Sequence, residues 1–263
     1  MFVLVNLGAV SLAANSWFVV EMPNKDIHKK GFSPEPPEGC DLSKERILLH
    51  CCCAPCSTAI IEWMVGAGLR PGIFFSNSNI VPFREYSIRR EELCRYAAAH
   101  GLETIEDEYD HADWLSFVRR LETAGNTEVS PQTSEPTTSV AEPVIRIADM
   151  PERGPRCLEC FKFRLLRAAD YASSHGYTLL TTTLASSRWK DLKQVDTAGG
   201  WACGQTNVQS PGTKVVWWSQ NWRRGGLQER RGVLIKEWAM YNQTFCGCEF
   251  SERHQASITP PVF

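Results

Sequence analysis

The stretch "ILLHCC", residues 47–52, constrains the fold most, because it is a short continuous apolar run that leads straight into a helical pattern. Such a run is typical of a central parallel strand that is covered on both faces. Ser57 or Thr58 can cap the helix that follows in residues 58–68. A strand followed at once by a helix is the first unit of a parallel α/β arrangement.

The same alternation continues along the chain. Further strands are expected at residues 70–80, 103–110, 178–186 and 214–222, and further helices at 83–102, 112–124, 157–177 and 233–248. This pattern predicts an α/β fold with an open, doubly wound parallel sheet, Rossmann-like (nucleotide α-hydrolase-like), with a C-terminal helical portion.

We expect one α/β catalytic domain over residues 46–251 of the 263. Residues 1–45 predict a partly disordered N-terminal extension that ends in a Pro- and Gly-rich approach to the domain. Residues at about 125–152, rich in Thr, Ser and Pro, predict a mobile insertion, and residues 252–263 a C-terminal tail. The apolar N-terminus lacks a preceding Lys or Arg and is interrupted too soon to span a membrane, so a cytoplasmic protein is expected.

Cysteine usage needs its own explanation, since a chain of 263 residues can bury a core without covalent staples. The eleven cysteines are an odd number and are clustered, and neighbouring cysteines cannot easily bridge one another. Metal ligation in a reducing cytosol explains such clusters better than disulfides do. The clusters are Cys51, Cys52, Cys53 and Cys56, then Cys157 and Cys160, then Cys246 and Cys248, with Cys40, Cys94 and Cys203 single.

The first cluster stands where a doubly wound fold binds its ligands, in a loop after the carboxyl end of a strand. A phosphate-binding loop would be rich in glycine, whereas residues 51–56 contain none. The helix N-terminus there suits an anionic metal–thiolate group better than a phosphate. Spacing alone leaves two choices open: two structural zinc ions, or an iron–sulfur cluster whose spare thiols serve a second metal or proton and electron chemistry.

Six segments of the chain together resemble one known family. They are "LLHCCCAPCS", "FFSNSNIVPFREYSIRREE", "EYDHADW", "RCLECFKFRLLRAADYASSHGY", "TTTLASSRWKD" and "FCGCEFS". Over roughly residues 46–251 the chain resembles the QueH-type epoxyqueuosine reductases. The resemblance implies an oxidoreductase that reduces epoxyqueuosine to queuosine in the anticodon loop of tRNA, without cobalamin. It also implies a [4Fe-4S] cluster, an additional iron ion and an external electron donor.

The resemblance also assigns individual cysteines. The family's paired cysteines with a following Cys, its C-x-x-C and its C-x-C match the expected metal ligands, namely Cys52, Cys53, Cys56, Cys157, Cys160, Cys246 and Cys248. Cys51 departs from the family, where an aliphatic residue is common. As the strand neighbour of Cys52, it should point to the opposite face. The three single cysteines are expected to be ordinary core or surface thiols.

The reaction accounts for the surplus of thiols. Converting an epoxide to an alkene takes two electrons and two protons and releases water, and a Lewis-acidic metal can activate the epoxide oxygen. Our hypothesis is that some thiols hold the cluster and the rest, together with a carboxylate, hold the second iron. Asp110 is the candidate ligand or catalytic acid, and a helix N-cap before Trp114 is an equally good interpretation of it.

An RNA substrate requires aromatic stacking and phosphate contacts, because the reacting base must leave its stack. A local basic stretch runs from Lys214 to Lys236, although the net charge of −2 gives no global basic field. The loop "SSRWKD" stands where many relatives have a Ser-Pro-Tyr-Gln type of loop, so contacts there do not transfer from the family. The candidate substrate-binding residues are Asn79, Tyr86, Arg89, Lys190, Trp222, Arg223 and Arg224.

Two other functions remain open from the sequence. A zinc-stabilised RNA-binding module without redox activity would use the same cysteines, and only its metal content would separate it from the enzyme. An ATP-dependent tRNA thiolase of the related nucleotide-binding fold is disfavoured, because its S-G-G-x-D-S phosphate loop is absent where "HCCCAPCS" stands.

Overall fold

A five-stranded parallel sheet forms the centre of the computed structural model, which describes residues 33–124 and 146–251. Its strands are β1 (Ile47–Cys51), β2 (Gly72–Phe75), β3 (Thr104–Glu106), β4 (Leu179–Thr182) and β5 (Val216–Trp217), in the order β3-β2-β1-β4-β5. All neighbouring strands pair in parallel. This order, with the first strand in the middle, confirms the predicted Rossmann-like, doubly wound α/β fold.

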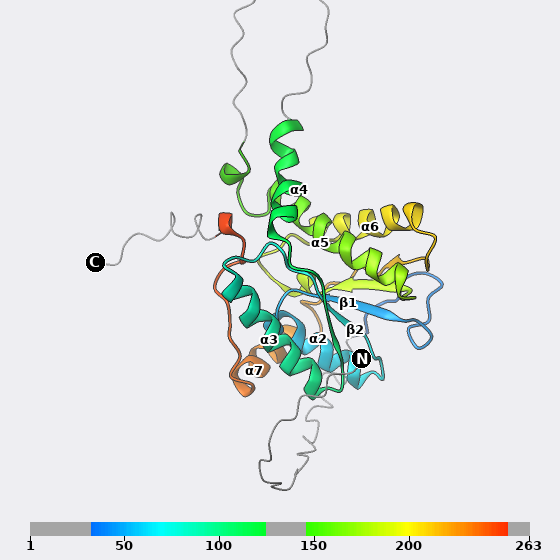
Figure 1. Ribbon diagram of the computed structural model, residues 1–263. Helices are drawn as coiled ribbons and strands as arrows, with labels where there is room; N and C mark the ends of the chain where they lie inside the picture. The colour runs from blue at the N-terminus through cyan, green and yellow to red at the C-terminus, as the bar shows by residue number, and fades with distance from the viewer. Residues whose placement is uncertain (1–32, 125–145, 252–263) are drawn as a thin grey trace, which may run out of the picture.

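Helices cover both faces of the sheet (Figure 1). One layer holds α2 (Ala54–Gly66), α3 (Phe83–Ala99) and α7 (Leu227–Glu237), and the other holds α4 (His111–Ala124), α5 (Pro155–Ser174) and α6 (Leu192–Gln209). Two short 3₁₀ helices, η1 (Ile147–Asp149) and η2 (Thr183–Ser186), complete the described elements. Because both faces are covered, all five residues of β1 are buried, which explains the unbroken apolar run.

Several element boundaries differ from the sequence prediction. Helix α2 begins at Ala54 with Cys53 as its extended N-cap, so neither Ser57 nor Thr58 caps it. Ser57 instead donates its hydroxyl to the Cys53 carbonyl over 2.7 Å, one turn back within the helix. Proline in the first turn makes this early start possible, since its fixed φ suits a helix and its missing N–H is not needed there.

The C-terminal prediction was also wrong in detail. Helix α7 begins before residue 233 and ends at Glu237, so the C-x-C pair lies in a loop and not at a helix end. Helix α6 was not predicted at all, because its three glycines, at positions 199, 200 and 204, weaken the helical pattern. Gly199 has a packing reason, since a Cβ built on it would lie 2.3 Å from the ring of Trp217.

The close approach of Trp217 makes Gly199 a test of how α6 packs on β5. We expect Gly199→Ala to lower the free energy of unfolding by about 1–3 kcal/mol, the usual cost of overpacking a filled site. Gly200→Ala is the matched control, because the space around that position is open and alanine favours helix by up to about 1 kcal/mol. Denaturant unfolding of both variants measures the difference, and equal stabilities would contradict this packing.

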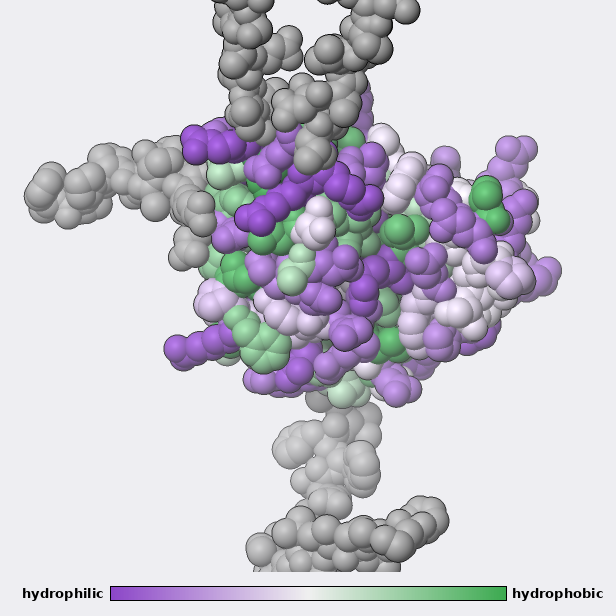
Figure 2. All heavy atoms as spheres, turned by 45° about the horizontal axis from the view of Figure 1, so that its top comes forward, coloured by the Kyte–Doolittle hydropathy of each residue, from purple (hydrophilic) through white to green (hydrophobic). Residues whose placement is uncertain are grey.

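Other sequence predictions fall partly outside the described residues. Residues 1–32, 125–145 and 252–263, which carry most of the predicted extension, insertion and tail, lie outside them. Within residues 33–124 and 146–251, no helix is long and apolar enough to cross a membrane. On the face that Figure 2 presents, hydrophilic and hydrophobic residues are intermixed, without one continuous apolar surface.

Candidate metal centre

Three thiols lie together where β1 ends and α2 begins. The Sγ atoms of Cys52, Cys53 and Cys56 all lie within 4.8 Å of one another, the only such group of three metal-binding side chains in the described residues. Cys53 is the extended residue before α2 and Cys56 lies in its first turn, so the change from strand to helix brings the side chains together. This group can hold a metal ion.

Hydrogen bonds among these thiols shift their pKa values in opposite directions. Hydrogen bonds from Cys53 and Cys56 hold the pKa of Cys52 well below its usual range, and the charge of Arg164 adds to this. Hydrogen bonding to Cys52 raises the pKa of Cys53, and it raises the pKa of Cys56 to about 12. Cys52 is thus the thiol of the three that loses its proton most readily, and a metal ion that binds all three sulfurs must compete with protons for the other two.

Polar groups from distant segments reach the same sulfurs. The Thr183 hydroxyl lies 3.6 Å from Cys52 Sγ. Gln243 Nε2 donates to Cys53 Sγ over 2.7 Å, while its Oε1 is buried without a hydrogen-bond partner among the described residues. Cys51 stays outside the group of three, because its buried thiol donates to the carbonyl two residues back, over 3.5 Å. Thr183 and Gln243 are neighbours of the site that the sequence pattern did not indicate.

A second group of thiols comes from two segments far apart in the sequence. Cys157 and Cys160 lie near the start of α5, and Cys246 and Cys248 lie in the loop after α7. Lys190 Nζ donates to Cys246 Sγ over 2.6 Å. A hydrogen bond from Cys248, together with the charge of Lys190, holds the pKa of Cys246 well below its usual range. Burial raises the pKa of Cys157 to about 11. In the second group too, the surroundings separate the pKa values, lowering that of Cys246 and raising that of Cys157.

The C-x-C loop is held in place although it is not helical. Arg89 on α3 pairs with Glu85 at 2.6 Å and donates to the carbonyl of Cys246 over 3.0 Å. The backbone N–H of Val81 donates to the carbonyl of Gly247 over 2.9 Å. Gly247 has φ +106, and a Cβ there would lie 3.1 Å from the Arg89 guanidinium, so glycine is required. Arg89, predicted to bind substrate, is buried and positions the cysteine loop.

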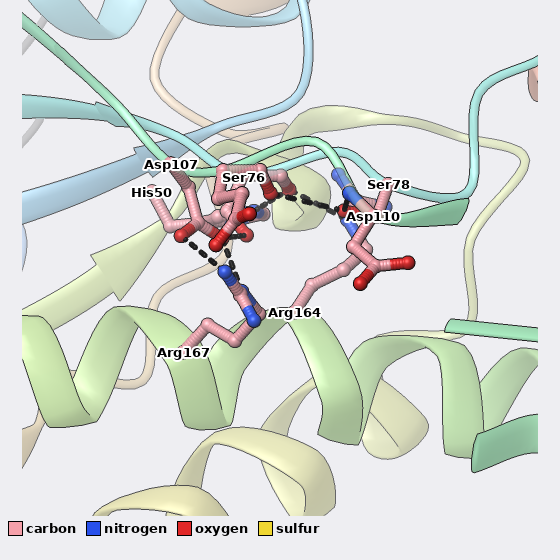
Figure 3. Close-up of polar contacts among 8 residues, drawn as sticks. His50, Ser76, Ser78, Asp107, Asp110, Arg164 and Arg167 are labelled. Atoms are coloured by element: carbon pink, nitrogen blue, oxygen red, sulfur yellow. Dashed lines mark hydrogen bonds and ion pairs between the residues drawn. The ribbon is translucent and has the colours of Figure 1, made fainter. Parts of the chain in front are cut away.

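Arg164 reaches from α5 toward the ends of the strands (Figure 3). Its Nε donates to the carbonyl of Ser76 over 3.1 Å, and its Nη2 donates to Asn77 Oδ1. The same Ser76 carbonyl lies 3.1 Å from His50 Nε2, and burial, aided by the Arg164 charge, lowers the pKa of His50 to about 3. The imidazole is therefore neutral and donates that hydrogen bond. Arg164 is fixed entirely by neutral groups.

Among the described residues, the buried charge of Arg164 has no carboxylate partner. Its side chain is 2 % exposed, and no ion pair within residues 33–124 and 146–251 includes it. A buried cation is costly without a counter-ion. Its charge favours the thiolate forms of Cys52, Cys160 and Cys246, which belong to both thiol groups. Metal-bound thiolates would supply the missing negative charge, so the residues present fit an anionic metal–thiolate centre.

The structure places four predicted site residues away from solvent or in structural contacts. Trp222 is 0 % exposed and packs against Trp63 and Trp218, so it presents no face to an RNA base. Tyr86 is buried among aromatic rings. Asn79 is buried too, and its Oδ1 has no hydrogen-bond partner among the described residues. Asp110 accepts the backbone N–H of Asp113 at the start of α4, which is the N-cap alternative.

The three remaining candidates lie around one loop. Lys190 turns inward to Cys246, as described above. Arg223 Nη2 donates to the carbonyls of Ser187 and Lys190, the latter over 2.7 Å. Arg224 beside it is exposed. Of the predicted substrate-binding residues, Arg224 is thus the one whose side chain is open to a large ligand.

Cys203, a single thiol on α6, should make the free energy of unfolding fall as the pH rises into the alkaline range. Burial raises its pKa to about 12, above the unfolded value of about 8.5. Its contribution is therefore fully present below about pH 8.5 and is lost as the pH rises toward 12. Between pH 8 and 10.5 we expect a loss of about 2–3 kcal/mol that Cys203→Ala lacks. Anaerobic denaturant unfolding at both pH values tests this, and equal losses in the two proteins would contradict it.

Fold and side chains together define a class of protein: a parallel α/β domain of Rossmann-like fold with a group of thiols, at the carboxyl end of its central strand, that can bind a metal ion. Comparison with known families narrows this class. The family model described as "Epoxyqueuosine reductase QueH" matches residues 47–132 and 123–254. The chain belongs to the QueH family of epoxyqueuosine reductases.

Individual relatives agree with this assignment. A protein of Histophilus somni named epoxyqueuosine reductase QueH is 35% identical over 208 residues, which cover 79% of this chain and 72% of the relative. The Haemophilus influenzae protein of the same name is 34% identical over 219 residues, covering 83% and 75%. That of Thermotoga maritima is 30% identical over 205 residues, covering 78% and 89%. The similarity therefore includes most of the described domain.

Proposed function

We propose that this protein reduces epoxyqueuosine to queuosine in the anticodon loop of tRNA, in the cytoplasm, with electrons from an external donor and without cobalamin. Residues 46–251 form the catalytic domain in this proposal. The observation that carries it is the buried guanidinium of Arg164, whose charge lowers the pKa of thiols in two separate groups and which has no carboxylate partner in the described residues. Membership of the QueH family supports the substrate.

The cofactors in this proposal are a [4Fe-4S] cluster and an additional iron ion. Cys52, Cys53, Cys56, Cys157, Cys160, Cys246 and Cys248 would hold them. When bound, they would pass on the electrons of the external donor and supply a Lewis acid for the epoxide oxygen. The protein supplies charge compensation: Arg164 and Lys190 place positive charge beside thiolates of the site. Such hydrogen bonds and charges tune a metal centre and orient its ligands.

Proton supply and substrate contact complete the proposal. Removing the epoxide oxygen as water consumes two protons, and Asp110, at the start of α4 after β3, is the proposed acid. Its backbone N–H donates to Ser78 Oγ over 3.1 Å, which fixes its backbone beside the segment that follows β2 (Figure 3). Arg224, which is exposed, is the proposed phosphate contact.

The direct test incubates reconstituted, reduced protein with tRNA that carries epoxyqueuosine. Mass spectrometry of the digested tRNA should show loss of one oxygen atom from the modified nucleoside. Protein without reductant is the control, because the electrons must come from outside. No loss of oxygen with a reduced centre present would overturn the proposed function.

Metal content separates the enzyme from a zinc-stabilised RNA-binding module. Anaerobically prepared protein should be brown and contain about four or more iron atoms per chain together with acid-labile sulfide. Zinc at a stoichiometry of one or two, without sulfide, would contradict the proposed cofactors.

A further inference from the structure

One residue beside the second thiol group has no part in the function proposed above. Trp189, in the loop between η2 and α6, is 75 % exposed, more than any other aromatic side chain in the described residues. Scattered apolar side chains on a surface need no explanation, but an exposed tryptophan is uncommon and is costly to leave in water. Its neighbours in the sequence show why the fold presents it there.

Two arginines clamp the backbone of this loop. Arg153 donates to the carbonyl of Arg188 over 2.9 Å and to the carbonyl of Trp189 over 3.1 Å. From the other side, Arg223 donates to the carbonyls of Ser187 and Lys190. A loop whose successive carbonyls are all bonded to guanidinium groups presents its side chains in a preformed position. Less conformational entropy is then lost when Trp189 binds a ligand.

The clamp also ties Trp189 to the thiols. The Arg153 backbone N–H donates to Cys157 Sγ over 3.3 Å. Lys190, the residue after Trp189, donates to Cys246 Sγ over 2.6 Å. Arg153 adopts φ 64, a left-handed conformation that is strained for a residue with a side chain, and Gln194 Nε2 holds its carbonyl over 2.7 Å. The loop therefore turns Lys190 inward to the site and Trp189 outward at its rim.

Charge around Trp189 indicates the kind of ligand. Arg188, the residue before Trp189, and Arg224, the residue after Arg223, are both exposed. Burial lowers the pKa of Arg223, the nearby charge of Arg153 lowers it further and that of Asp191 raises it, so two guanidinium groups lie close together here. The adjacent acid, Asp191, is engaged in capping α6 through the backbone N–H of Lys193 over 2.8 Å. An exposed ring with flanking cations suits a stacked base and its phosphates.

We propose, on the basis of the function proposed above, that Trp189 is the stacking platform for an unpaired base adjacent to the modified nucleotide of the anticodon loop. Arg188 contacts a phosphate of the same strand. The neighbouring base rests on Trp189 while the modified nucleotide enters the site beside Lys190 and the second thiol group. Trp189 is thus a substrate-positioning residue, and it takes no part in electron or proton transfer.

Binding of an unmodified anticodon stem-loop RNA to the metal-loaded protein tests this without depending on the reaction. We expect Trp189→Ala to weaken the Kd by about 5- to 100-fold, the range of base–aromatic stacking. Trp189→Phe should retain most of the affinity, because it keeps an aromatic face. Val208→Ala is the control, since Val208 is 86 % exposed on α6 and should leave the Kd unchanged.

Salt dependence and metal content exclude a merely structural effect. Arg188→Gln should reduce the slope of log Kd against log salt by about 0.7–0.9, as expected for one lost phosphate contact, whereas Trp189→Ala should leave the slope unchanged. Iron content and the visible spectrum should match the wild type in both variants. A Trp189→Ala protein that binds the stem-loop as the wild type does, or that loses iron, would overturn the stacking role.

Failure of the wild type to remove oxygen from the modified tRNA would instead overturn the proposed function.

Discussion

Replacing Cys53 with alanine is expected to remove bound metal and to lower turnover by more than about 100-fold. Loss of a hydrogen-bond partner of a ligand alone typically costs 10–100-fold in metal affinity or activity, and loss of a ligand should exceed that. Cys53 is the N-cap residue of α2, between that helix and β1, and its Sγ lies 3.8 Å from Cys52 Sγ. Its removal also leaves the Gln243 side-chain amide without its acceptor.

Cys51→Ala is the matched control for this prediction. Cys51 lies two positions away on the same segment and is equally buried, but it is not part of the group of three thiols. Its substitution removes one buried sulfur and should retain iron, sulfide and turnover. Iron and sulfide assays with single-turnover reduction of the modified tRNA measure both variants. If Cys53→Ala kept its iron, or if both variants lost it equally, the proposed ligand set would be wrong.

The second large effect concerns stability. Glu62→Gln is expected to lower the free energy of unfolding by about 3 kcal/mol, the low end of the cost of breaking a buried ion pair. Glu62 on α2 and Arg230 on α7 form a two-pronged pair at 2.8 Å and 3.0 Å, and both are 9 % exposed. Glutamine would remove the charge of Glu62 from the buried guanidinium, whose pair with Glu237 lies on the solvent side.

The pair joins the helix that carries Cys56 to the helix that precedes the C-x-C loop. Its loss should therefore destabilise the whole layer without removing any metal-binding group. Glu106→Gln is the control, because its pair with Arg90 is longer, at 3.4 Å, and exposed, so it should change stability by less than about 1 kcal/mol. Denaturant unfolding of the two variants tests this. Equal, small effects would mean that the buried pair does not stabilise the packing of α2 against α7.

Much of the fold follows from local features of the sequence. An unbroken apolar run predicted β1 as a central strand, because a strand that is buried on both faces is apolar at every position. Strand-like and helix-like segments alternate along the chain, and this alternation predicted the doubly wound sheet. Helix boundaries were predicted less well. Helix α2 begins earlier than predicted because Pro55 favours the first turn, and helix α6 was not predicted because its glycines weaken the helical pattern. A glycine lowers helix propensity wherever it stands, even where a tryptophan packs against it.

The candidate site was likewise predicted in part from the sequence and decided in part by the tertiary structure. Spacing within a segment determined which cysteines can act together, because residues within one strand end or helix turn are neighbours in any fold. Only the tertiary structure decided that Lys190 reaches Cys246, that the buried charge of Arg164 acts on the thiols, and that Trp222 is core while Trp189 is exposed. A sequence pattern reports how a segment meets solvent on average. Which distant side chains meet is set by how the helices pack on the sheet, and buried cations therefore look like surface residues until the fold is known.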